Sequence, residues 1–443
     1  MLQPQELYHH IQSSCSSKEF LIAYSGGLDS HVLLHLMNAI SQTTDIKIRA
    51  LYVNHGLQKE ADIWATHCQK TCQEMQISCD VVKLNLSLES GESVEALARN
   101  GRYQALQQSL QVDEVLLTAH HQNDQAETLL LQLFRGAGVD GLASMPKITG
   151  FGLGQQLRPL LDFSKDDLVA YANHYHLDYI DDPSNQDHRF DRNYLRHVVI
   201  PLIQERWLGV NKVLARAADI QAETAQVLDN LAAEDLQEIR STSHQENELS
   251  INALLLLSEP RQKLVLRYWI KQQGFLAPSS KKLLHLFKDV LHAKKDANPL
   301  LAWQGVQLRR FKNRLYIMPP LCDFDSSQVI NWDMKNNLFI PALEIELQAS
   351  EFNILLKAQN RQCDHTQITV RFRHGGETVF IDDKTGNVSL KRTTSLKKTA
   401  SLKKLLQDAQ IPPWQRSRVP LIYLDDKLIH VCINPNLFTK EDK

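Results

Sequence analysis

Short apolar runs alternate with amphipathic helical patterns along the N-terminal part of the chain. The runs predict four strands, which cover residues 20–23, 46–53, 77–84 and 114–118. Between the strands, apolar residues recur at helical spacing after residue 31, over 61–75 and over 93–110. Strands that alternate with helices of this length are typical of α/β proteins. The pattern therefore predicts an α/β domain built on a doubly wound parallel sheet.

The alternation of strands and helices fades after Pro201. Residues 211–231 are alanine-rich with helical periodicity, and residues 251–318 predict a small helical unit that closes in short strands. We expect a polar linker at 323–337 and a third unit with strands near 368–372 and 421–433. The chain is thus expected to form three domains. Their predicted bounds are 1–210, 211–322 and 338–443, the last a small α+β unit.

Charge is nearly balanced over the 443 residues, with a net charge of −2, but it is uneven along the chain. Between Arg361 and Pro420, twelve Lys and Arg stand against five Asp and Glu, which leaves a net charge of +7. Such a segment attracts an anionic polymer, and a solvated surface is the alternative explanation. Within it, Ser395-Leu-Lys-Lys398 is echoed by Ser401-Leu-Lys-Lys404, which predicts an amphipathic helix with a lysine face.

Two classes of protein are disfavoured by composition. No apolar run reaches the ~18 residues that a membrane-spanning helix needs, and residues 1–10 lack the pattern of a secretion signal. We therefore expect a cytoplasmic protein with no membrane partner, in which the seven cysteines are free thiols. Cys68, Cys72 and Cys79 do not have a zinc-ligand spacing, so we expect them to be small buried hydrophobic residues.

The strongest local motif lies between the first strand and the helix that follows it. It reads Ser25-Gly26-Gly27-Leu28-Asp29-Ser30. Glycines let the backbone turn sharply, and the first amides of a helix lack intrahelical partners, so such a corner attracts phosphate. An ordinary turn is the alternative. Unlike the common phosphate loop that ends in Gly-Lys, this one has no lysine and carries Asp29, which indicates a metal-bridged polyphosphate.

A second cluster of polar residues follows the fourth strand. His120, His121, Asn123 and Asp124 lie at this strand end, and Asn54-His55-Gly56 lies at the end of the second strand. Ligands of doubly wound sheets bind beyond the carboxyl ends of the strands. His120 and Asp124 are four residues apart, so a helical turn is expected to place them on one face near the glycine loop.

Together these segments resemble the tRNA(Ile)-lysidine synthetase family of the N-type ATP pyrophosphatase (PP-loop) superfamily. The resemblance is strong over residues ~20 to 205 and resumes in the C-terminal domain, whereas the middle domain is similar only in position and helical character. The segments that carry it are 25–30, 119–128, 133–142, 158–161, 182–185, 192–196, 371–377, 402–406 and 412–421.

The resemblance implies an ATP- and Mg²⁺-dependent ligase. It would join free L-lysine to C2 of the wobble cytidine (C34) of the isoleucine tRNA that has a CAU anticodon. ATP would adenylate the base, and AMP and diphosphate would leave. Residues 1–210 would form the catalytic domain, residues 211–322 a helical tRNA-binding linker domain, and residues 338–443 a C-terminal tRNA-binding domain.

The resemblance also assigns roles to particular residues. The loop from Ser25 to Ser30, with Asn54 and His55, is expected to bind the nucleotide. The expected metal ligands are Asp29 and Asp124, and the expected catalytic residues are Asp29, His120, Asp124 and Arg192. Arg192, with Arg196, would stabilise charge at the α phosphate or hold the lysine carboxylate. Trp414, Arg416 and Arg418 would clamp the tRNA, and a packed aromatic is the alternative for Trp414.

Two positions depart from the family pattern. Asn123 stands where the first of two consecutive aspartates is usual, and Gln58 replaces a basic residue. Three other functions stay open on the sequence alone: a tRNA-thiolating PP-loop enzyme, a small-molecule ligase related to NAD or GMP synthetases, and a tRNA-binding protein with a regulatory nucleotide site. The oligomeric state also stays open, a homodimer being one alternative.

Overall fold

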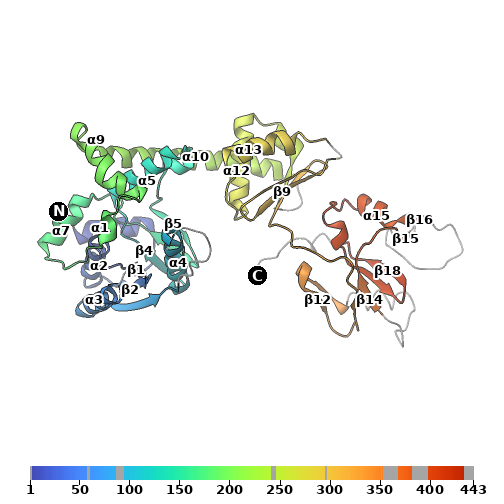
Figure 1. The fold of residues 1–443 in the computed structure, drawn as a ribbon, viewed down its shortest axis with the longest axis horizontal. Helices are drawn as coiled ribbons and strands as arrows, with labels where there is room; N and C mark the ends of the chain where they lie inside the picture. Colours follow the sequence, from blue (N-terminus) through green and yellow to red (C-terminus); the bar gives the residue numbers. More distant parts are fainter. Residues whose placement is uncertain are drawn as a thin grey trace. The chain divides into compact units, whose positions relative to one another are not determined.

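The computed structural model describes residues 2–56, 60–85, 94–240, 246–294, 297–350, 352, 368–381 and 398–433. It divides into two compact units, Met1–Asp229 and Asn230–Lys443. Figure 1 shows the elements of both units along the chain. Among the described residues, no helix is long and apolar enough to cross a membrane.

The first unit is built on a six-stranded sheet of order β3-β2-β1-β4-β6-β5. Its strands are β1 (Glu19–Ala23), β2 (Lys47–Asn54), β3 (Ser78–Lys83), β4 (Glu114–Leu117), β5 (Ile148–Phe151) and β6 (Gly154–Leu157). All neighbours pair in parallel except β5, which forms an antiparallel hairpin with β6 at one edge. The predicted α/β fold with a parallel sheet is confirmed.

Helices cover both faces of this sheet because its central strand is apolar on both sides. Phe20 and Ile22 of β1 point into one buried cluster, and Leu21 between them points into another. In Figure 1, α1 (Pro4–Ser14) and α2 (Leu28–Ser41) lie on one side of the sheet and α4 (Val94–Ser109) on the other. This alternation is the period of two expected of a strand. The parallel pairing of β1, β2, β3, β4 and β6 places the carboxyl ends of these strands at one edge.

The remaining helices of the first unit follow the strand ends or lead away from them. They are α3 (Ala61–Glu74), α5 (Gln122–Phe134), α6 (Val139–Leu142), α7 (Lys165–His174), η2 (Pro183–Gln186), α8 (Asp191–Tyr194), η3 (Leu195–Val199) and α9 (Ile200–Arg206). Helix α10 (Val210–Arg240) is longer than the predicted 211–231 and passes the boundary between the units at Asp229.

The second unit begins with the predicted small helical region that closes in strands. Its helices are α11 (Ile251–Leu255), α12 (Glu259–Gln272), α13 (Ser280–His285) and η4 (Leu286–Leu291). Its sheet has the order β7-β10-β9-β8, formed by β7 (Glu248–Ser250), β8 (Leu300–Trp303), β9 (Val306–Phe311) and β10 (Arg314–Met318). Trp269 is completely buried in the core of this region.

The C-terminal part of the second unit is mainly β structure. Its four-stranded sheet has the order β11-β14-β17-β18, formed by β11 (Ile330–Asn331), β14 (Ile368–Arg371), β17 (Leu421–Leu424) and β18 (Lys427–Val431). Two further antiparallel pairs join β12 (Leu338–Ile340) with β13 (Ile345–Leu347) and β15 (Thr378–Ile381) with β16 (Lys398–Ser401). The short helices are η5 (Pro341–Leu343), α15 (Leu402–Asp408) and η6 (Arg416–Arg418).

Two local predictions for this part are wrong. The lysine-faced helix does not begin before Leu402, because Ser401 caps α15 by accepting a hydrogen bond from the Lys404 amide, and Lys398–Ser401 forms strand β16. The first half of the echo, residues 395–397, lies outside the described residues. The predicted polar linker at 323–337 contains β11, and its Trp332 and Met334 are buried in the C-terminal core.

Candidate functional site

The glycine loop makes a close turn between β1 and α2. Gly26 has φ +78°, a left-handed backbone conformation that favours glycine, and its carbonyl accepts a hydrogen bond from the Ile180 amide at 2.9 Å. A Cβ placed on Gly26 would lie 2.4 Å from Ile180 Cδ1 and 2.9 Å from Cys68 Sγ. Both the backbone and the packing therefore require glycine at this position.

The Gly26→Ala variant is expected to be less stable than the wild type by about 2–4 kcal/mol, because strain in the left-handed region and overpacking against Ile180 add together. Urea unfolding followed by circular dichroism measures the difference. Gly150→Ala is the matched control, because Gly150 lies in β5 with open space around its Cβ position. An equal loss of stability in both variants would contradict this account.

Serine side chains brace the loop from inside. The Ser30 hydroxyl accepts a hydrogen bond from the Ser25 amide at 3.1 Å and donates one to the Gly27 carbonyl at 3.0 Å. The hydroxyls of Ser25 and Ser30 lie 3.0 Å apart. The first bond along α2 joins the His31 amide to the Gly27 carbonyl, so the preceding amides of the turn have no acceptor within the helix. The loop is thus a rigid backbone cradle at a helix N-terminus, where anions bind.

Asp29, in the first turn of α2, has two cationic or ionisable neighbours. Its Oδ1 atom lies 2.6 Å from Lys165 Nζ, and its Oδ2 atom lies 3.6 Å from His121 Nε2. Burial by itself raises the pKa of Asp29, but the hydrogen bond and charge of His121, together with Lys165, lower that pKa to about 2. Asp29 is therefore ionised at neutral pH, at the entrance of the loop.

His121, rather than His120, contacts both Asp29 after β1 and Asp124 after β4. It is the residue that precedes α5, its amide donates to Asp124 Oδ2 at 3.0 Å, and its Nε2 atom lies 3.5 Å from the same oxygen. The prediction that His120 and Asp124 share a helical face is wrong, because α5 begins only at Gln122. His120 instead lies outside the helix, with Nδ1 3.0 Å from Thr118 Oγ1.

His120 is neutral at pH 7. Burial is the main cause that lowers its pKa to about 4, against the opposing charge of Asp124, and the charges of Arg158, Arg192 and Arg102 lower it further. The Nδ1 atom of His120 is within hydrogen-bond distance of the Thr118 hydroxyl. The same hydroxyl accepts a hydrogen bond from Gln156 at 3.0 Å. A neutral imidazole among arginines serves as a hydrogen-bonding group more readily than as a proton donor.

His120 should make the protein sensitive to acid. Its pKa is lower in the folded state than in the unfolded state, so stability falls as the pH drops from about 6.5 to about 4. Over that pH range, protonation of His120 should lower the free energy of unfolding of the wild type by about 2–3 kcal/mol. The His120→Gln variant lacks this group, so its free energy of unfolding should fall less than that of the wild type, by the same amount. Urea unfolding at pH 7 and pH 4.5 measures it, with His9→Gln on the exposed side of α1 as the control. Equal pH dependence of the His120 variant and wild type would refute the prediction.

Asp124 belongs to a network in which two buried carboxylates contact two partly exposed arginines. Arg196, on η3, donates to Asp124 Oδ1 at 3.0 Å and to both oxygens of Glu127, at 2.6 and 2.9 Å. Arg192, on α8, donates to Thr128 Oγ1 at 2.7 Å, and its Nε lies 3.6 Å from Glu127 Oε2. These contacts place Asp124 and Arg192 in one network with Arg196, next to His121 and Asp29.

The two carboxylates of this network differ in acidity. For Asp124, burial raises the pKa, but His121, His120 and Arg196 outweigh it, so the pKa is lower than usual. For Glu127, burial prevails over the opposing effect of Arg196, so the pKa is raised. Glu127 is therefore the stronger base of the two.

The residues predicted at the end of β2 are only partly described. Asn54 is buried, donates to Asp62 Oδ1 at 2.9 Å and accepts a hydrogen bond from the Gly56 amide at 2.8 Å, so its side chain shapes the turn. His55 is partly buried, and burial lowers its pKa. Gln58 lies outside the described residues. Asn123, the other departure from the family pattern, accepts a hydrogen bond from the Lys165 amide at 3.1 Å.

Sequence reasoning did not single out Lys165, His121 or Glu127 as site residues. Lys165 lies 136 residues from its partner Asp29, so only the fold brings the two together. His121 and Glu127 were within the motif, but the motif alone did not show which histidine precedes the helix or that Glu127 is 1% exposed.

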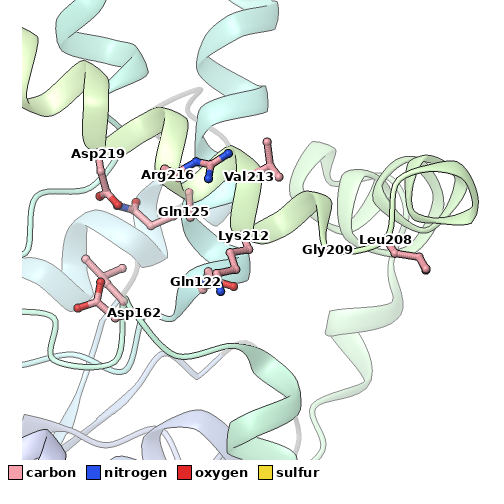
Figure 2. Close-up of a pocket in the computed structure, with 11 residues that line it drawn as sticks. Gln122, Gln125, Asp162, Leu208, Gly209, Lys212, Val213, Arg216 and Asp219 are labelled. Carbon is pink, nitrogen blue, oxygen red and sulfur yellow. The ribbon is translucent and has the colours of Figure 1, made fainter.

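A cavity of about 470 Å³ lies beside the first turn of α5 (Figure 2). Gln122 and Gln125 line it together with Lys212 and Arg216 of α10. The loop at residues 25–30 is not among the described residues that line it, so the cavity is separate from the predicted nucleotide site.

In the second unit, Trp414 is 8% exposed and packs edge-on against Tyr316, with ring centres 5.5 Å apart. The Arg309 guanidinium lies 5.3 Å from its ring centre. These contacts favour the packed-aromatic alternative for Trp414. Arg416 and Arg418 both donate to backbone carbonyls, those of Ile411 and Cys322.

Three family models match the chain in sequence order. A PP-loop domain matches residues 2–203, a TilS substrate binding domain matches 249–316, and a TilS substrate C-terminal domain matches 368–441. The loop, the network around Asp124 and the neighbouring Lys165 all lie within the first match.

Curated relatives match over almost the whole length. The tRNA(Ile)-lysidine synthase of Coxiella burnetii is 43% identical over 429 residues, which cover 97% of this chain and 91% of that protein. The enzyme of the same name from Serratia proteamaculans is 40% identical and covers 93% of this chain and 90% of its own length. That of Methylococcus capsulatus is 37% identical with the same two coverages. The chain therefore belongs to the tRNA(Ile)-lysidine synthase family.

Proposed function

We propose that this protein joins free L-lysine to C2 of the wobble cytidine (C34) in the isoleucine tRNA with a CAU anticodon. ATP adenylates the base, and AMP and diphosphate are released. The observation that carries the proposal is the glycine loop at a helix N-terminus with the ionised Asp29 beside it. It occurs in a chain whose relatives, all named tRNA(Ile)-lysidine synthase, match over 93–97% of its length. We place the reaction in the cytoplasm, where its three substrates occur together.

In the first step the cytosine O2 attacks the α phosphorus of ATP, and the bond to the β phosphate breaks. The free amides at the start of α2 and the Gly26 turn are suited to hold the departing diphosphate, because charge develops there as the bond breaks. No protein nucleophile is needed. Arg192 and Arg196, which lie next to Asp124, are suited to stabilise charge at the α phosphate or to hold the lysine carboxylate.

Mg²⁺ fits this site as an ion bound jointly with phosphate. Magnesium commonly takes one or two protein carboxylates plus substrate phosphates. Among the described residues, no group of three His, Cys, Asp or Glu side chains could hold a metal ion by itself. Asp29 would be the main ligand, since its side chain is 32% exposed, and Asp124, 11% exposed and paired with Arg196, the second. The ion would supply positive charge to the departing diphosphate.

In the second step the lysine ε-nitrogen attacks C2, the bond from C2 to the AMP oxygen breaks, and AMP leaves. The amine must lose a proton, and its reference pKa near 10.4 makes that costly at pH 7. We assign this proton to Asp124, whose side chain is 11% exposed, because Glu127 is 1% exposed and both of its oxygens accept hydrogen bonds from Arg196. His120, neutral and close to the arginines, would accept or donate a hydrogen bond to substrate.

The other two matched regions are suited to tRNA. The family model of residues 249–316 is described as a substrate binding domain and that of residues 368–441 as a substrate C-terminal domain. The second of these regions contains most of the positively charged segment between Arg361 and Pro420. A tRNA-thiolating enzyme is disfavoured because the sequence has no C-x-x-C pair. A small-molecule ligase would not need the two substrate domains.

The test is incubation of the protein with ATP, labelled lysine and total tRNA. We expect label to enter one tRNA class and AMP to form in equal amount. ATP converted to AMP without label in RNA would refute lysidine formation and favour a small-molecule ligase.

A further inference from the structure

A lysine lies at the phosphate loop although the loop sequence contains none. Lys165 Nζ is 2.6 Å from Asp29 Oδ1, and its side chain is 37% exposed, so the lysine contacts the carboxylate and is still accessible to solvent. Loops that bind polyphosphate commonly use a lysine for this charge, and here the lysine comes from the first position of α7.

The backbone of Lys165 is held in place from two sides. Its amide donates to Asn123 Oδ1 at 3.1 Å, which ties the start of α7 to the first turn of α5. Ser164 caps α7, its hydroxyl accepting a hydrogen bond from the Asp167 amide at 3.2 Å. Helix α7 also joins α2 through the 2.9 Å contact between Tyr171 Oη and His35 Nδ1. The position of the Lys165 backbone is therefore set by the helices that carry the site, whereas its side chain is free to change conformation.

Three helix starts meet at this ammonium. Asp29 is in the first turn of α2, His121 precedes α5, and Lys165 begins α7. Each helix N-terminus carries partial positive charge, and diphosphate carries several negative charges. Among the described residues, Lys165 and His121 are the ionisable groups within 4 Å of Asp29, and the charge of Arg196 acts on Asp29 as well. Lys165 is the one of these whose flexible side chain pairs directly with Asp29.

We propose that Lys165 is a diphosphate-binding residue, whose ammonium moves from Asp29 to the phosphate oxygens when the loop is filled. This inference rests on the proposed function, since it names the residue that holds the departing diphosphate. The short side-chain movement needs no change in α7, because only the end of a flexible side chain leaves Asp29.

A simpler role must be separated from this one. Lys165 could act only through Asp29, by neutralising the carboxylate and holding it in position. Asp29→Asn removes that carboxylate charge and thus the partner of Lys165. In the Asp29→Asn background, a Lys165 that acts only through Asp29 contributes nothing to diphosphate binding, whereas a Lys165 that contacts phosphate still contributes.

The experiment measures binding of inorganic diphosphate by titration calorimetry. Wild-type protein is titrated first with magnesium present. Asp29→Asn and the double variant Asp29→Asn/Lys165→Ala are then titrated in EDTA, and Lys165→Arg and Lys47→Ala are titrated beside the wild type. Lys47 is the matched control, because its Nζ pairs with Glu19 at 2.8 Å at the amino ends of the strands. Circular dichroism melting shows that each variant is folded.

We expect the double variant to bind metal-free diphosphate about 10- to 100-fold more weakly than Asp29→Asn, the usual effect of losing one charge-assisted hydrogen bond. Lys165→Arg should stay within about 3-fold of wild type, and Lys47→Ala should not differ from it. If Asp29→Asn and Asp29→Asn/Lys165→Ala bound diphosphate equally well, Lys165 would not be a diphosphate-binding residue, but the proposed function would stand. The same would follow if Asp29→Asn bound no diphosphate. Wild-type protein that bound no diphosphate with magnesium would overturn the proposed function as well.

Discussion

Replacing Asp29 with alanine should reduce lysidine formation by about 1,000-fold, with ATP conversion to AMP lost in parallel. Asp29 is the ionised carboxylate at the entrance of the loop, with its pKa lowered to about 2. Its removal takes away the main candidate metal ligand and leaves Lys165 without its partner at 2.6 Å. The rate of label transfer from lysine to tRNA, measured beside AMP release, gives both effects in one assay.

Asp45→Ala is the matched control for this substitution. Asp45 pairs with Lys18, and both side chains are exposed. Asp45 precedes β2 and Lys18 precedes β1, so the pair lies at the amino ends of the strands, remote from the loop. The control should retain wild-type activity. Modification of tRNA at a normal rate by Asp29→Ala would contradict a catalytic role for the loop.

Replacing Arg196 with alanine should destabilise the protein by about 3–5 kcal/mol at pH 7, because two buried carboxylates lose their shared partner. Glu127 is 1% exposed and accepts two hydrogen bonds from Arg196, and Asp124 accepts a third. The difference from wild type should shrink as the pH falls, since the raised pKa of Glu127 lets this carboxyl take up a proton and lose its charge. Urea unfolding at pH 7 and pH 5 measures both.

Arg189→Ala provides the comparison for Arg196. Arg189 also forms a bidentate pair, with Asp187, but its side chain is 87% exposed, so the variant should be nearly as stable as the wild type. If the Arg196 and Arg189 variants were equally stable, the buried network would not hold α5 and η3 together.

The strands were predictable because a strand that is buried on both faces has a short continuous run of apolar residues in the sequence. The run at 20–23 is apolar throughout, and the run at 114–118 is apolar from Val115 to Leu117; the observed β1 and β4 differ from the predicted strands by one residue at an end. The glycine loop was predictable for a similar reason, since its position between a strand and a helix is a local property. Structural features that depend on residues close to one another in the sequence can therefore be predicted from the sequence.

Contacts between distant segments were not predictable in this way. Glu127 and Arg196 are 69 residues apart, and nothing near either residue marks the other as its partner. The choice between His120 and His121 depends on where α5 begins, which Asp124 decides by accepting the His121 amide. At Trp332, a polar neighbourhood concealed a residue that is buried in the C-terminal core.

The meeting of Asp29, His121 and Lys165 also has a consequence for the order of events during synthesis. Asp29 and Lys165 are separated by 136 positions, so the ribosome must release most of the first unit before the two can meet. A nascent chain that has already formed β1 and the glycine turn still lacks the cation from α7. Tight polyphosphate binding should therefore emerge late, as a sign that the whole N-terminal unit has folded.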